Sequence, residues 1–170
     1  MKQRFTSRAT AVNGKAGKLP AIYKKINLDG LCILDIGCGA EVKHIRKFAR
    51  ENGAKWYGID PYNRTDSQNR YNFNKWHENA ENGAKTLIIS SNVLNVIDDE
   101  RVVKGAVNAI TVNGGAYAVT VYEGNGSGVG KQTGRDQWQR NEKLKEYLKY
   151  FSADAVIKKG VITNAPELIK

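Results

Sequence analysis

Acidic and glycine residues follow an apolar run near the start of the chain, and their spacing suits the binding of a small charged ligand. The run 31–34 leads into Asp35, Gly37, Cys38 and Gly39, a pattern typical of a buried strand that ends in a tight turn. Glycines permit a left-handed backbone and leave main-chain N–H groups unshielded, and the start of a following helix adds a positive dipole end. The turn therefore suits a carboxylate or a phosphate.

A second acidic residue stands at the end of the next predicted strand. Asp60 follows the strand 55–59 and lies 21 residues beyond Gly39. At this distance α/β nucleotide-binding folds place a carboxylate that accepts hydrogen bonds from ribose hydroxyls. Val42 stands where a dinucleotide-binding fingerprint needs its third glycine, which disfavours a nicotinamide-dependent oxidoreductase but leaves it as an alternative.

Together, the glycine turn within 32–41 and the acid within 56–61 resemble the class I S-adenosylmethionine-dependent methyltransferases, over roughly residues 31–151. The resemblance implies that the turn holds the methionine part of the cofactor and that the acid holds its ribose. The cofactor-binding residues that it implies are Asp35, Gly37, Cys38, Gly39, Asp60, Pro61, Tyr62, Ser91 and Asn92. A Rossmann-like domain whose glycines only make a tight turn stays open as an alternative.

The segment after the third predicted strand is where this family places residues that face cofactor and substrate. Asn92 is a candidate catalytic residue there, and Glu123, at the end of a later strand, is the candidate base. The sequence at 90–93 lacks the Pro-Pro-aromatic motif of amino-methylating DNA enzymes and the Pro-Cys nucleophile of cytosine C5 enzymes. Since both familiar mechanisms of base methylation are in doubt, a noncatalytic S-adenosylmethionine-binding regulator and a small-molecule methyltransferase remain alternatives.

Basic residues gather at the two ends of the chain. The 170 residues carry a formal net charge of +10, of which 1–30 holds +6 and 131–170 holds +4, while 31–130 is neutral. This distribution fits contact with a polyanion, so we expect a nucleic acid, DNA or RNA, or another anionic acceptor; basic tails that only aid solubility are the alternative. The candidate substrate-binding residues are Lys15, Lys18, Asn95, Lys131 and Arg135.

Apolar periodicity predicts the elements that position these residues. We expect one α/β domain over 1–170, with a basic flexible arm over 1–19, an N-terminal helix within 20–30 and an α/β core over 31–170. Helices are predicted at 41–51, 71–82, 98–112 and 138–151, strands at 31–34, 55–59, 86–90 and 116–122, and a terminal hairpin at 155–163. The resemblance implies a Rossmann-like class I methyltransferase fold with a mostly parallel sheet and a C-terminal antiparallel hairpin. The interval between Asp60 and the third strand is short, so we expect an abbreviated sheet.

The glycine-rich segment 123–130 predicts a mobile loop at the edge where open α/β sheets bind ligands. Basic residues follow it, which is typical of a substrate lid, although simple flexibility is an equal alternative. The pattern over 123–148 also resembles methyltransferase-like proteins that accompany bacterial and phage DNA-modification systems.

Other features exclude several classes of function. Cys32 and Cys38 fall in a predicted strand and turn, which indicates reduced thiols in a cytoplasmic protein, and two cysteines without a histidine cluster make no metal site. We expect His44 and His77 to be solvated rather than catalytic. No apolar run approaches the roughly 20 residues that span a bilayer, so no membrane partner is expected.

Overall fold

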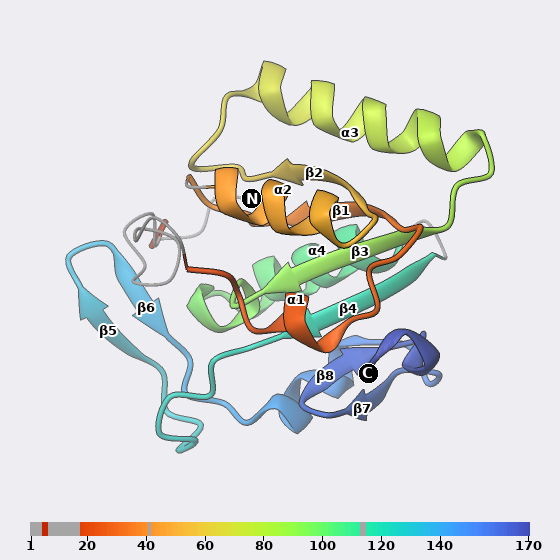
Figure 1. The fold of residues 1–170 in the computed structure, drawn as a ribbon. Helices are drawn as coiled ribbons and strands as arrows, with labels where there is room; N and C mark the ends of the chain where they lie inside the picture. Colours follow the sequence, from red (N-terminus) through yellow and green to blue (C-terminus); the bar gives the residue numbers. More distant parts are fainter. Residues whose placement is uncertain (1–4, 7–17, 41, 113–114) are drawn as a thin grey trace.

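The computed structural model describes residues 5–6, 18–40, 42–112 and 115–170. Its larger sheet consists of β1 (Cys32–Ile36), β2 (Lys55–Ile59), β3 (Thr86–Ser91), β4 (Ala116–Thr120), β7 (Val156–Lys158) and β8 (Val161–Thr163). The strand order is β2-β1-β3-β4-β8-β7 (Figure 1). A separate two-stranded sheet pairs β5 (Lys131–Gly134) with β6 (Gln137–Gln139).

The direction of the strands confirms the predicted α/β class and the mostly parallel sheet. β1 pairs in parallel with both β2 and β3, and β3 pairs in parallel with β4. β8 is antiparallel to both of its neighbours, β4 and β7. Lys159 and Gly160, with φ of 48° and 73°, connect β7 to β8, as a two-residue hairpin turn requires. The predicted C-terminal hairpin is therefore confirmed.

Helices cover both faces of the sheet (Figure 1). The α-helices are α1 (Ile22–Lys25), α2 (Lys43–Glu51), α3 (Asp66–Glu81) and α4 (Glu100–Thr111), and the 3-10 helices are η1 (Leu94–Val96), η2 (Leu144–Tyr150) and η3 (Pro166–Leu168). α1, α2 and η3 pack on the face that carries Ile33 and Ile89, whereas α4 and η2 pack on the face that carries Leu34 and Ile88. This layering is compatible with a Rossmann-like fold.

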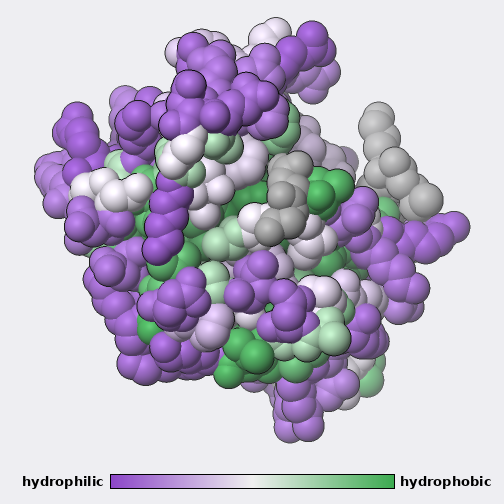
Figure 2. All heavy atoms as spheres, turned by 90° about the vertical axis from the view of Figure 1, so that its right-hand side faces the viewer, coloured by the Kyte–Doolittle hydropathy of each residue, from purple (hydrophilic) through white to green (hydrophobic). Residues whose placement is uncertain are grey.

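Helix α3 covers the edge of β2, with which no other described strand pairs, in agreement with the predicted abbreviated sheet (Figure 1). The Asn72 side chain donates to the carbonyl oxygen of Gly58 at 2.8 Å. The Asn69 side chain accepts from the N–H of Asp60 at 2.9 Å and donates to its carbonyl oxygen at 3.0 Å. Asparagine side chains thus satisfy main-chain groups that a neighbouring strand would otherwise pair. The outward surface of this top layer is hydrophilic in Figure 2.

The predicted helix 71–82 begins five residues earlier, at Asp66. Thr65 accepts a hydrogen bond from the Gln68 N–H, and the Gln68 side chain accepts from the Thr65 N–H, which is a complete capping box. Of the aromatic side chains of α3, Trp76 is buried in the core while Tyr71 is largely exposed.

The predicted helix 138–151 is wrong over its first half. Residues 137–139 form β6, and the helical segment is the 3-10 helix η2, which begins only at Leu144. Asn141 has a φ of 56° and Lys143 is extended, so the backbone between β6 and η2 is not helical.

Candidate functional site

The glycine turn connects β1 to α2 at the carboxyl end of the sheet. Gly37 and Gly39 have φ of 79° and 74°, a left-handed backbone that favours glycine. The N–H groups of Gly37 and Cys38 donate to the carbonyl oxygen of Ile59 at 2.8 and 3.2 Å, which fastens the turn to the end of β2. A Cβ on Gly37 would lie 2.3 Å from Cγ2 of Val93, so the segment after β3 packs directly on the turn.

The Asp60 carboxylate organises the end of β2. Its Oδ2 accepts from the Gly39 N–H at 2.9 Å. Its Oδ1 accepts from the N–H groups of Tyr62 and Asn63, at 2.9 and 2.8 Å, and from the Asn63 side chain at 3.1 Å. Asp60 therefore joins the glycine turn to its own loop, and a ligand hydroxyl would have to share Oδ2 or replace one of these donors.

Asp35 is buried beneath the turn in a hydrogen-bonded chain of three side chains. The Trp56 indole N–H donates to the Tyr23 hydroxyl at 2.7 Å, and that hydroxyl donates to Asp35 Oδ2 at 2.5 Å. Burial raises the pKa of Asp35 to about 7, although the hydrogen bond from Tyr23 opposes this shift. Burial and the nearby Asp35 raise the pKa of Tyr23 well above its usual value, so Tyr23 stays a donor.

Tyr23 was not among the residues predicted for the site. It lies in α1, and only the packing of α1 against the sheet brings it to Asp35. Its place one residue after Ile22 in a short apolar segment gives no local signal of this contact.

Cys38 is a buried thiol within the turn. The Arg64 Nε–H donates to its sulfur at 3.2 Å. Burial raises the pKa of Cys38 to about 12, which outweighs the opposing effect of Arg64. Cys38 is therefore protonated near neutral pH and is suited to packing rather than to nucleophilic attack.

The segment after β3 brings polar residues beside the turn. The Ser91 and Thr120 hydroxyls are hydrogen-bonded at 3.1 Å, and the Asn92 N–H donates to the Thr120 carbonyl oxygen at 2.8 Å. Asn92 has a φ of 58°, in the left-handed region. Asn95 is buried, and its side-chain amide donates to Oε1 of Gln139 at 3.2 Å.

The hairpin β5–β6 carries two of the predicted substrate-binding residues. Lys131 and Arg135 are exposed on it, while Asn95 lies buried at its base. The Gln139 side chain donates to the Tyr122 carbonyl oxygen at 2.9 Å, which connects the hairpin to the end of β4. Asn95 therefore contacts the hairpin directly.

The N-terminal residues 5 and 6 dock on the same hairpin, a contact that the sequence did not predict. The rings of Phe5 and Trp138 stack with centroids 5.5 Å apart, and Phe5 is buried. The Thr6 N–H donates to Asp136 Oδ1 at 3.1 Å. Lys18 is exposed, and its carbonyl oxygen contacts the ring nitrogen Nε2 of His44. The predicted substrate residue Lys15, like most of the basic arm, lies outside the described residues.

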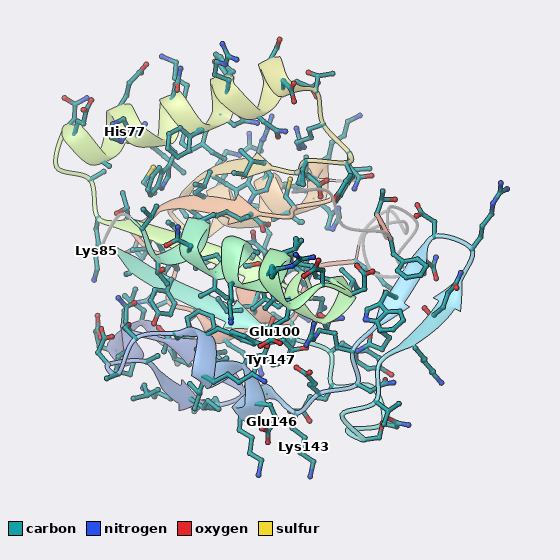
Figure 3. The ribbon with its side chains drawn as sticks, turned by 180° about the vertical axis from the view of Figure 1, so that it is seen from behind. His77, Lys85, Glu100, Lys143, Glu146 and Tyr147 are labelled. Carbon is teal, nitrogen blue, oxygen red and sulfur yellow. The ribbon has the colours of Figure 1, made fainter. Side chains whose placement is uncertain are left out.

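Glu123 has a structural contact at the start of η2. Its Oε1 accepts from the Leu144 N–H at 2.7 Å. Nε2 of His77 lies 3.3 Å from Oε1 of Glu81 on α3, far from Lys143 in Figure 3. Both described histidines thus have contacts away from Glu123.

All nine predicted cofactor residues lie at or just after the ends of three adjacent strands, β2, β1 and β3. The connection from β1 runs through α2 on one face of the sheet, and the connection from β3 runs through α4 on the other. Open α/β sheets bind ligands at such a switch point. The arrangement places two glycines with a left-handed backbone, two carboxyl groups and short polar side chains around one edge of the sheet.

A comparison with models of known protein families found no match, and a comparison with curated protein sequences found none either. Among the residues that the structure describes, no group of three or more His, Cys, Asp or Glu side chains could hold a metal ion. Over the same part of the chain, no helix is both long and apolar enough to span a membrane.

Proposed function

We propose that this chain is a class I S-adenosylmethionine-dependent methyltransferase that acts on a nucleic acid or another anionic acceptor. The observation that carries the proposal is the switch point itself, where a glycine turn after β1 and an acid after β2 are joined by the bond from Gly39 to Asp60. The sheet of this family also ends in a pair of antiparallel strands, as β8 and β7 do. The chain has an abbreviated version of that sheet, with α3 in place of an outer strand.

The residues at the switch point fit the cofactor in type and position. Gly37 and Gly39 give the turn the left-handed backbone of a tight strand-to-helix connection, the kind of turn that would lie beside the methionine part of the cofactor. Asp35 and Asp60 supply carboxylates for a ligand that carries positive charge on sulfur and on its amino group. Asp60 would hold the ribose through Oδ2, sharing it with the Gly39 N–H.

S-adenosylmethionine, when bound, supplies an electrophilic methyl group on sulfur. The contribution of the chain is to orient the acceptor and to exclude water. Ser91 and Asn92 lie next to the turn and are suited to orient an acceptor atom. Glu123 uses one carboxylate oxygen for η2, which leaves the other as a candidate to accept a proton.

A noncatalytic S-adenosylmethionine-binding regulator is the second candidate function. The observation that favours it is that the candidate base Glu123 and the candidate substrate-binding residue Asn95 both have structural contacts. Glu123 accepts from the start of η2, and Asn95 is buried against Gln139. A protein that kept the cofactor site but had lost its catalytic groups would have such contacts.

Isothermal titration calorimetry tests the cofactor. We expect S-adenosylhomocysteine to bind at one site and NAD not to bind. Asp60→Asn preserves the shape of the side chain but weakens the acceptor, so it should lower the affinity by about tenfold, the loss of one charge-assisted hydrogen bond. Binding of NAD in preference to S-adenosylhomocysteine would contradict the proposal.

A further inference from the structure

A surface groove lies between the glycine-rich loop and η2. Residues 126–128 form one wall, and Lys143, Lys145 and Lys149 extend from the other; we call this the lysine groove. Figure 3 shows Lys143 directed away from the body of the molecule, whereas Tyr147 lies beneath α4. Glu123, three residues beyond the end of β4, accepts from the Leu144 N–H, so the end of the groove at Lys143 lies near the carboxyl end of β4.

The charges along this groove are predominantly positive and largely uncompensated. Glu142 is occupied by a half-buried ion pair with Arg140 at 2.9 Å. The one ion pair of Glu146 within the described part of the chain is with Lys145, at the weak distance of 4.0 Å. Lys131 and Arg135 of the hairpin β5–β6 are exposed and form no ion pair with any described residue.

The glycine loop does not offer a main-chain cradle for a single phosphate. The Gly126 N–H donates to the Glu123 carbonyl oxygen at 3.0 Å, and the Gly128 N–H donates to the Asn141 carbonyl oxygen at 2.9 Å. The Ser127 N–H donates to the Asn125 side chain at 3.1 Å. The contact groups that remain are long lysine side chains, which suit the spaced phosphates of a polymer better than one enclosed anion.

Tyr122 has an exposed aromatic ring and directly precedes Glu123, whose Oε1 accepts from the Leu144 N–H next to Lys143 of the groove. The Tyr122 side chain is 62% exposed, and it lies two residues beyond Thr120, whose carbonyl oxygen accepts from the Asn92 N–H. Gln139 holds the main chain of Tyr122 in place, so the ring is presented from a fixed backbone. Along the chain Tyr122 therefore lies between Thr120, which contacts the candidate catalytic segment, and Glu123, which contacts the start of η2.

We infer that this surface binds single-stranded nucleic acid, with a base stacked on Tyr122 and the phosphates held by the lysine groove. Exposed aromatic rings next to a positive groove are the usual means of binding single strands, because every unpaired base offers a flat face. A duplex fits less well, because its base faces are stacked inside the helix and cannot reach the ring. An acidic protein would contact the lysines but has no base to stack on Tyr122. This inference names single-stranded nucleic acid as the acceptor class of the proposed methyltransferase. The role of the bound strand as a methyl acceptor rests on the proposed function, whereas the binding itself does not.

Fluorescence anisotropy with a labelled single-stranded oligonucleotide of mixed sequence, without cofactor, tests the inference on the full chain. Tyr122→Ala should weaken binding by about 5- to 100-fold, the usual effect of losing one stacked base, and Tyr122→Trp should restore it. Tyr71→Ala is the matched control, since Tyr71 is equally exposed, at 62%, but lies on α3. It should leave binding unchanged.

The lysine groove is tested by salt dependence. Replacing Lys143, Lys145 and Lys149 with Gln should flatten the slope of log K against log salt by about 2, because each phosphate contact on a single strand contributes about 0.7. The same replacement at the exposed Lys24, Lys85 and Lys104, on other parts of the surface, should leave most of the slope.

Three results would overturn the inference: no binding of the oligonucleotide, tighter binding of the matching duplex, or an affinity that Tyr122→Ala does not change. If heparin binds as tightly as the oligonucleotide, and Tyr122→Ala changes neither affinity, the surface is a general site for acidic polymers and the inference is wrong. Calorimetry with S-adenosylhomocysteine on the same variants tests the proposed function separately. The variants leave the cofactor residues intact, so they should bind S-adenosylhomocysteine like the parent chain even if the oligonucleotide does not bind.

Discussion

Asp35 is the residue at which fold stability and ligand binding make opposite demands. Its carboxyl group is buried, and its pKa is raised from 3.8 to about 7. An acid with a raised pKa holds its proton longer in the folded chain than in the unfolded chain. Its contribution to stability therefore falls as the pH rises from about 4 to about 7, and it stays constant at higher pH. In its ionised form Asp35 would nevertheless suit the positively charged cofactor that we propose.

Asp35→Asn should therefore stabilise the fold at high pH. The amide oxygen can still accept from the Tyr23 hydroxyl, and no charge is buried. The advantage over the parent chain should grow by about 2–3 kcal/mol between pH 5 and pH 8, measured by urea unfolding at both values. Glu167→Gln, an exposed control, should show no such growth. An advantage of Asp35→Asn that does not change with pH would contradict the raised pKa.

Gly37 combines a left-handed backbone with a close neighbour. The left-handed backbone at this position should make Gly37→Ala destabilise the fold by roughly 1–3 kcal/mol. The clash of the new Cβ with Val93 should add a further cost. Gly83→Ala isolates the backbone part, because Gly83 has nearly the same φ, 80°, and a Cβ added there would have no other atom within 4 Å. In urea unfolding, adding Val93→Ala to Gly37→Ala should recover part of the excess. No difference between Gly37→Ala and Gly83→Ala would mean that Val93 does not pack on the turn.

The sequence predicts the ends of β1 and β2 well because their signals are local. A buried apolar run followed by glycines predicts the position of the turn. The interval from Gly39 to Asp60 predicts an acid at the end of β2, and the Gly39 N–H does donate to Asp60. The contact of Tyr23 with Asp35 depends on packing between elements, so no spacing rule could reveal it. The three donors from Tyr62 and Asn63 that engage Asp60 were missed for a different reason: they depend on the path of its loop.

Among the elements, α3 has the least usual task. It presents amides to the edge of β2 as well as burying Trp76 in the core. Asn72→Ala should leave the Gly58 carbonyl oxygen without its partner and should cost about 1–3 kcal/mol in unfolding free energy. Asn74→Ala, an exposed asparagine on the same helix, should have little effect. Equal costs for the two variants would show that the bond to β2 contributes nothing.

The elements that the sequence missed are short and polar. β5 and β6 have only four and three residues, and their sequences show no apolar alternation. Trp138 and Leu144 were therefore assigned to one helix, although they belong to β6 and η2. The early start of α3 did have a signal, since Thr65 and Gln68 are spaced as a capping box requires.

At the scale of the whole molecule, the chain terminus and the hairpin β5–β6 are joined by the stacked pair of Phe5 and Trp138. Phe5→Ala should raise hydrogen–deuterium exchange within 131–139, because the hairpin loses a covering ring. β1 and β3 should keep their protection. Phe73→Ala, in α3, should not affect the hairpin. Unchanged exchange in 131–139 would show that the N-terminal contact does not stabilise it.

Transfer of tritium from labelled S-adenosylmethionine tests the proposed function most directly. The acceptors are single-stranded DNA, RNA and a metabolite extract, each incubated with the full chain and with Asp60→Asn as the control, at a cofactor concentration below saturation. We expect label in nucleic acid with the parent chain and much less with Asp60→Asn. Absence of label from every acceptor, while calorimetry shows that S-adenosylhomocysteine binds, would contradict a methyltransferase and favour the regulator.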